Sequence, residues 1–209
     1  VLQTNTTGSS NIAIGRNSLY VNTTGAQNTS IGVESLDANT TANDNTAVGF
    51  ASLGATTTGH SNVAIGRDAM LSNLTGDGNT ALGYKALFTN NGSTPDFNTA
   101  IGRQALYSNT TGTVNVAVGY LALLNNTTAS YNVGVGGTAL RANTTGANNV
   151  AVGYQALLAN TTATGNVAVG KDALLAQTTG GNNVAVGLSA MAANTTGTGN
   201  TALGANALD

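Results

Sequence analysis

A 17-residue repeat runs through almost the whole chain and constrains the fold more than any other feature of the sequence. Its marker is the Gly that closes a motif of the form N-x-A-V-G, found at residues 15, 32, 49, 66, 83, 102, 119, 136, 153, 170, 187 and 204. Successive markers are 17 residues apart, except for Gly83 and Gly102, which are 19 apart. A short fixed period of this kind is typical of solenoids, in which each repeat is one coil stacked on the next.

The unit follows a strict pattern when it is numbered from its Asn, so that the marker Gly is unit position 5. Position 4 is always aliphatic, position 9 is always Leu or Met, and positions 3 and 8 are always Ala, Ser or Gly. Position 12 is usually Asn, followed in most units by Thr-Thr. The consensus is N-[TV]-A-[VI]-G-x-x-A-L-x-x-N-T-T-G-x-x.

Short strands explain this unit better than a helix does. Segments such as QALLAN (155–160) contain helix-favouring residues, but the corner Gly and the Asn-Thr-Thr-Gly turn leave only about six residues between them, too few for a stable helix. Leucine-rich repeats are a rival solenoid, with a longer unit of about 20 to 29 residues. We therefore predict an all-β fold: a parallel β-solenoid (β-roll) of twelve 17-residue coils, with two short strands in each.

Stacking places identical residues above one another, at about 4.8 Å per coil, which gives a rod roughly 55 Å long. We predict an amide ladder at position 12 in which Asn126, Asn143 and Asn160 each donate to the next coil. Residues 1–209 would form a single repetitive domain. Because the chain opens at Val1 and stops at Asp209 within a repeat, we expect it to be a fragment of a longer fibre.

The alternation of side chains along a strand predicts two faces. If the aliphatic position 4 points into the coil, the small position 3 points away from it. The invariably small residues at positions 3 and 8, such as Ala117 and Ala156, then predict a surface where the backbone of another chain comes close. The alternative is a tight corner inside a single thin coil.

The repeat also resembles those of known surface fibres. NIAIG (11–15) and NVAVG (115–119) are similar to the SVAIG units of trimeric autotransporter adhesin heads, the YadA-like proteins. The longer phrase NTTG…NTAVGY.AL looks like repeat tracts of bacterial and phage tail-fibre-like proteins. The resemblance covers nearly the whole chain and implies a left-handed, homotrimeric β-solenoid used for attachment at the bacterial cell surface, or alternatively in a virion tail fibre. The adhesin-head unit is usually shorter, and the general rule for parallel crossovers would favour a right-handed coil.

Composition argues against several other classes of protein. Only 7% of the residues are charged, the net charge is −2, and there is no Cys. Nucleic-acid binding would need clustered Lys and Arg, and no apolar run approaches the roughly 18 residues of a membrane span. The eight acidic residues are scattered, and the single His, His60, is expected in a solvated loop. We therefore expect neither an enzyme nor a metal or cofactor site.

One stripe and one loop are the candidate binding sites. From Phe50 to Tyr120, position 6 alternates between aromatic and cationic residues, and stacking would place each Arg over a ring: Phe50, Arg67, Tyr84, Arg103 and Tyr120. This ridge would either stabilise the stack or bind a sugar or an anion. The two extra residues lie within an insertion near 88–98, where Asn91, Pro95 and Phe97 would form a contact loop or a tolerated bulge.

These observations leave two functions open. The first is a non-enzymatic, structural and adhesive segment of a trimeric fibre that contacts a glycan or protein receptor on a host or prey surface. The second is an ice-binding β-solenoid that uses the recurrent Thr-Thr pairs, although these lie beside Asn and Gly in a corner rather than on a flat strand.

Overall fold

The computed structural model describes residues 1–92 and 96–208, and these residues form a parallel β-solenoid. Each coil contributes one strand of three residues, and no helix occurs in the described ranges. The strands are β1 (Ile12–Ile14), β2 (Thr29–Ile31), β3 (Thr46–Val48), β4 (Val63–Ile65), β5 (Thr80–Leu82), β6 (Thr99–Ile101), β7 (Val116–Val118), β8 (Val133–Val135), β9 (Val150–Val152), β10 (Val167–Val169), β11 (Val184–Val186) and β12 (Thr201–Leu203).

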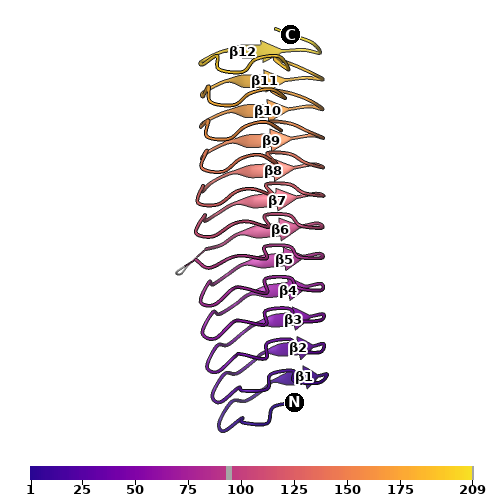
Figure 1. Cartoon of the computed structure of the whole chain (residues 1–209), viewed down its shortest axis with the longest axis vertical. Coiled ribbons are helices and arrows are strands. Elements are labelled where there is room, and N and C mark those ends of the chain that lie inside the picture. The colour runs from indigo at the N-terminus through magenta and orange to yellow at the C-terminus, as the bar shows by residue number, and fades with distance from the viewer. Residues whose placement is uncertain (93–95, 209) are drawn as a thin grey trace.

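The twelve strands form a single parallel sheet in sequence order, as the predicted stacking requires (Figure 1). The register follows the repeat, so that Ala100 lies beside Ala117, and across the insertion Leu82 still lies beside Ile101. Backbone hydrogen bonds join the coils outside the sheet as well, for example from Leu123 N to Ala139 O (2.9 Å). Each coil therefore serves as the template for its neighbour over most of its circumference.

The prediction of two strands per coil was wrong, because the half of the unit that contains position 9 is a series of turns. The Leu or Met at position 9 has a left-handed φ of 46–56° in every coil, and the residue at position 7 also has positive φ. Two left-handed residues so close together interrupt an extended backbone. Each costs about 1–2 kcal/mol, which burial of the Leu side chain, at about 1.5–3 kcal/mol, offsets.

The expected orientation of the strand was also wrong. Position 3 points into the coil, where Ala64, Ala81 and Ala117 are fully buried, while position 4 points outward and Ile14 and Leu203 are exposed. The lumen is narrow and the position 9 side chains occupy it from the opposite wall, so only a small residue fits at position 3. The tight interior of a single thin coil, the alternative interpretation, is therefore the correct one.

Contacts between positions 3 and 8 confirm that both lie inside one chain. The hydroxyls of Ser30 (position 3) and Ser35 (position 8) lie 2.6 Å apart in the interior, and Ser18 donates to Ser30 at 2.7 Å. A Cβ added to Gly134, at position 3 of the eighth coil, would lie 3.3 Å from Leu123 Cγ. The Ala residues at these two positions thus fill the core of each coil and are not available to a neighbouring chain.

The predicted amide ladder at position 12 is present, with its direction reversed. Asn143 Nδ2 donates to Asn126 Oδ1 of the preceding coil (2.8 Å), and Asn160 Nδ2 donates to Asn143 Oδ1 (2.7 Å). Asn143 Nδ2 also donates to the position 15 carbonyl of Gly146 (2.9 Å), which accepts a second bond from the position 1 residue Asn132 (2.9 Å). Two buried Asn per coil therefore hold the Thr-Thr-Gly corner closed.

The ladder breaks where position 12 is not Asn, and this gives a prediction for stability. Gln177 donates only to Gly180 O, and the buried Oδ1 of Asn160 below it has no partner in the described structure. We expect Gln177→Asn to restore this bond and raise the free energy of unfolding by about 1 kcal/mol. Urea unfolding measures the change. An unchanged or lower midpoint would show that the Gln side chain already stabilises this corner as well as Asn would.

No helix in the described part of the chain has the length and apolar character needed to cross a membrane.

Candidate functional site

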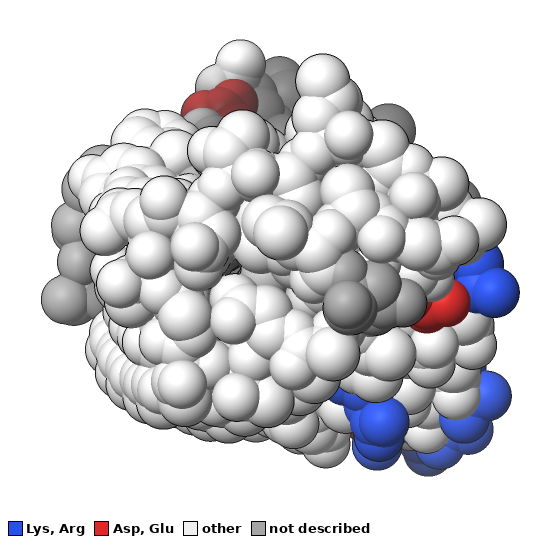
Figure 2. Space-filling model, turned by 90° about the horizontal axis from the view of Figure 1, so that it is seen from above, with Lys and Arg blue, Asp and Glu red and all other residues white. Residues whose placement is uncertain are grey.

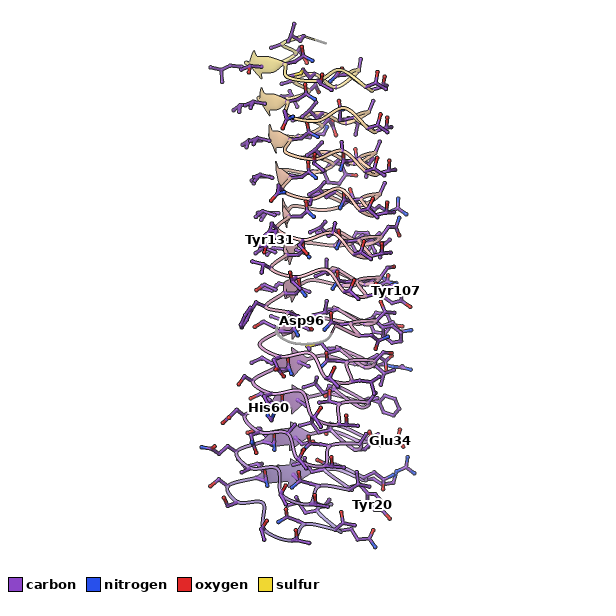
Figure 3. The ribbon with its side chains drawn as sticks, turned by 90° about the vertical axis from the view of Figure 1, so that its left-hand side faces the viewer. Tyr20, Glu34, His60, Asp96, Tyr107 and Tyr131 are labelled. Carbon is purple, nitrogen blue, oxygen red and sulfur yellow. The ribbon has the colours of Figure 1, made fainter. Side chains whose placement is uncertain are left out.

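The cations of the chain line one edge of the rod and follow the strand and the corner Gly in the sequence of each unit. All six Lys and Arg residues occupy unit positions 6, 7 or 10, which follow the corner Gly. Figure 2, a view down the rod, shows their side chains gathered at one edge. In Figure 3, Tyr20, Glu34 and Tyr107, at unit positions 7 and 10, lie on the side of the rod away from the strands, whereas His60 and Tyr131 lie on the strand side. We call positions 6, 7 and 10 the cationic edge.

The five residues of the predicted stripe make cation–π contacts in two groups, Arg67 with Phe50 and Arg103 with Tyr84 and Tyr120. Arg67 Cζ lies 5.4 Å from the centre of the Phe50 ring. Arg103 lies between two rings, with its Cζ 5.8 Å from the centre of Tyr84 and 5.9 Å from that of Tyr120. These side chains are exposed, so the stripe forms a ridge on the surface.

Three further residues join this ridge, and the sequence interpretation missed them. Lys85 Nζ lies 5.5 Å from the centre of the Tyr84 ring and 5.0 Å from that of Phe88. Phe88 stacks on Tyr107 of the next coil, with 5.1 Å between ring centres and 5° between ring planes. The available signal was that Phe88 and Tyr107 both occupy position 10, so the stacking argument used at position 6 applied there too. Tyr84, Lys85, Phe88, Arg103, Tyr107 and Tyr120 form the aromatic–cation cluster.

Three cations of the edge have acidic partners. Arg16 pairs with Glu34 (3.2 Å), Arg67 with Asp68 (3.4 Å) and Lys171 with Asp172 (3.5 Å). Among the residues that the structure describes, Lys85, Arg103 and Arg141 take part in no ion pair.

One carboxyl group on this edge has a perturbed pKa. Burial raises the pKa of Asp37, with a smaller contribution from the charge of Glu34. Asp37 lies in the second coil, far along the rod from the cluster in coils five to seven, so it does not supply a counter-charge there.

The insertion brings a buried carboxylate into the corner. In a regular coil the backbone carbonyl of position 15 accepts hydrogen bonds from the Asn side chains of positions 1 and 12. In the fifth coil, position 15 falls within residues 93–95, outside the described residues. Here Asp96 Oδ2 accepts instead from Asn79 Nδ2 (3.3 Å) and Asn90 Nδ2 (2.8 Å). The extra residues therefore leave the stack intact. Pro95 of the predicted contact loop lies outside the described residues.

Phe97 and two residues that the sequence interpretation missed form an exposed apolar row at position 17. Phe97, Val114 and Tyr131 follow one another in consecutive coils and are 57%, 42% and 59% exposed. All three have φ of 50–62°, a conformation that favours Gly or Asn. Large side chains in such conformations cluster at functional sites, so this apolar row is a second candidate contact surface. Asn91, the other predicted loop residue, is exposed beside the insertion.

The strain in the apolar row can be measured at Val114, the only β-branched member. We expect Val114→Asn to raise the free energy of unfolding by about 1 kcal/mol, because Asn tolerates left-handed φ far better than a β-branched residue. Asn148 and Asn182 already occupy the same unit position with φ of 60°. The urea midpoint is the measurement. A clear loss of stability would instead mean that Val114 packs favourably between Phe97 and Tyr131.

His60 is half-buried rather than simply solvated. Its Nδ1 accepts a hydrogen bond from Asn43 N (3.1 Å), and its own backbone N donates to Asp77 Oδ1 (2.6 Å) in the next coil. In the described part of the chain, no group of three or more His, Asp or Glu residues lies close enough together to hold a metal ion.

Comparison of the chain with protein-family models, with curated proteins and with solved structures found no match.

Proposed function

We propose that the chain is a non-enzymatic, structural and adhesive segment of a homotrimeric fibre that attaches a bacterial cell, or alternatively a virion, to a surface. A left-handed course of the coils and an extracellular location belong to this proposal and are supported by the resemblance of the repeat to adhesin heads and tail fibres. The observation that carries the proposal is the outer face of the twelve-stranded sheet.

This face, made by unit positions 2 and 4, is apolar from end to end. Nineteen of its 24 residues are Val, Ile or Leu, the other five are Thr, and none is charged. Several are well exposed in the single chain, among them Ile12, Ile14 and Leu203. A strip about 55 Å long and 10 Å wide has the size of apolar patch that marks an interaction site.

Two further copies of the chain are the occupants that fit this face best. The copies present the same flat strip at the same spacing along the rod, so three strips can meet around a common axis parallel to it. Such an interface would bury the position 4 residues, whereas the Ala residues at positions 3 and 8 remain inside each coil. The cationic edges would then lie at the outside of the trimer, where each ridge is repeated three times.

Charges on the strand face test this assembly. We expect sedimentation equilibrium to give a trimer for the natural chain and to show its dissociation, by about a hundredfold or more in trimer stability, for the double variant Val135→Lys, Val152→Lys, which would bury two unpaired charges. The matched control, Thr128→Lys with Thr145→Lys, places the same charges on exposed residues of the Thr-Thr corner. A monomeric natural chain, or equal dissociation by both variants, would reject the interface.

Attachment is tested on the assembled protein. Fluorescent fibre segments should adhere to glycan-bearing surfaces, and adherence should fall sharply for the dissociated variant because several weak contacts act together only in a trimer. Adherence that does not depend on assembly would argue against a trimeric adhesive.

Ice binding is the second candidate, favoured by the exposed Thr at position 14 of most coils. Thr128 and Thr145 are exposed and spaced one coil apart. The preceding Thr of each pair instead gives its hydroxyl to the neighbouring coil, as Thr127 Oγ1 does to Thr144 O (3.1 Å). Thermal hysteresis of freezing in a solution of the protein would favour ice binding, and its absence would favour the adhesive segment.

A further inference from the structure

We propose that the aromatic–cation cluster of coils five to seven is a binding site for saccharides that carry a carboxylate, such as uronic or sialic acid residues. The inference deepens the proposed attachment function by naming the chemical class of ligand that the fibre contacts. It is carried by the pairing of charges along the cationic edge and by the placement of the rings around Lys85 and Arg103, two of the cations that have no acidic partner in the described structure.

The charge pattern of the edge points to an anionic ligand. At unit positions 6, 7 and 10, the first four coils contain Arg16 and Arg67, together with acidic residues that pair with both. The nine residues at these positions in coils five to seven include Lys85 and Arg103 and no acidic residue. The only segment of the edge with two neighbouring cations and no carboxylate is therefore also the segment richest in aromatic residues.

Arg103 is held in a geometry that leaves its donors available. The rings of Tyr84 and Tyr120 contact its guanidinium from the coils on either side, at 5.8 and 5.9 Å. In the described structure its side chain donates no hydrogen bond and its residue is exposed. A guanidinium carries five N–H donors in a planar fork that matches a carboxylate. Contacts with the rings restrain this fork before a ligand arrives, which lowers the entropy lost on binding.

The neighbouring residues supply a second charge and a surface for the sugar ring. Lys85 lies over the rings of Tyr84 and Phe88, and Phe88 is stacked on Tyr107. A pyranose has C–H faces that pack on aromatic rings, whose faces carry partial negative charge. One saccharide can therefore contact a ring with its face while its carboxylate binds Arg103 or Lys85, and the charge-assisted bond selects acidic over neutral sugars.

The test measures binding of soluble saccharides to the whole chain by calorimetry. Trigalacturonate is compared with neutral galactotriose, and 3′-sialyllactose with lactose, so that the two pairs distinguish a uronic from a sialic acid ligand. We expect millimolar binding of at least one acidic sugar and about tenfold weaker binding of its neutral counterpart. Arg103→Gln should weaken binding of the acidic sugar about tenfold.

Lys171→Gln is the matched control, because Lys171 also occupies unit position 6 of the cationic edge but is paired with Asp172 and lies outside the cluster. We expect it to change the affinity less than twofold. Unfolding midpoints close to that of the natural chain show that both variants are folded. Equal binding of acidic and neutral sugars, an equal effect of Arg103→Gln and Lys171→Gln, or no binding of either acidic sugar would overturn the proposal.

These outcomes are independent of the attachment test. Binding of a soluble acidic sugar by a chain that neither trimerises nor adheres would support the site while rejecting the fibre. A trimer that adheres equally well with Arg103→Gln would support the fibre while rejecting the site.

Discussion

Ala117→Glu is expected to unfold the middle of the rod. Ala117 occupies position 3 of the seventh coil and is 0% exposed within its own chain. Its replacement would place a carboxylate among Leu side chains, at a cost of about 3–5 kcal/mol for an unpaired buried charge and about 1–3 kcal/mol more for the added volume. Hydrogen exchange of β6, β7 and β8 should rise first, because coils of a solenoid are stabilised mainly by their nearest neighbours.

Two control variants distinguish the cost of burying a carboxylate from the effect of any substitution in this coil. Tyr120→Glu adds the same charge three residues later on a side chain that is 52% exposed, and should change the stability by only about 0.5 kcal/mol. Ala117→Gly introduces the residue found naturally at Gly134, at the same unit position, and should cost about 1 kcal/mol. If Ala117→Glu instead left the chain folded and only dissociated an oligomer, position 3 would lie at an intermolecular surface after all.

Gly119→Ala is the second change for which we expect a large effect, a loss of about 3 kcal/mol or more in the free energy of unfolding. Gly119 is a corner Gly with φ of +135°, a conformation that L side chains rarely adopt. An added Cβ would also lie 2.5 Å from Gly136 O and 2.6 Å from Gly136 C of the next coil. The strand-to-strand spacing would have to open, and the hydrogen bond from Gly136 N to Val118 O (2.7 Å) would be disturbed.

The last coil offers a control that separates the cost of the backbone conformation from the cost of the clash with the next coil. Gly204 has a similar φ of +126°, but nothing lies within 4 Å of a Cβ placed there. Gly204→Ala therefore carries the conformational cost without the clash, and the difference between the two variants in urea unfolding estimates the contact with the next coil. Gly137→Ala, next to a corner, should be nearly neutral, because its Cβ would meet only the Tyr154 ring, at 3.3 Å or more. Equal effects at Gly119 and Gly137 would contradict this account.

Much of the candidate site followed from the repeat alone. A stack places residue i beside residue i+17 whatever the shape of the coil, so the contact of Arg103 with both Tyr84 and Tyr120 and the ladder through Asn126, Asn143 and Asn160 could be predicted. Contacts between different unit positions could not be predicted from the repeat. Lys85 reaches Phe88 because position 7 has a left-handed φ that turns the chain there, and no period in the sequence states this.

The fold likewise has features that the repeat determines and one that it leaves open. The sequence alone specified the number of coils, their parallel stacking and the corner Gly, because a constant spacing of 17 residues leaves each segment only its counterpart to pair with. Which face of the strand lies inside was decided only by the tertiary structure. Alternation along a strand defines two faces without saying which is buried, and here the Leu residues at position 9 fill the lumen from the opposite wall. The small Ala residues therefore turn inward, and the larger Val and Ile residues are left on the outer face.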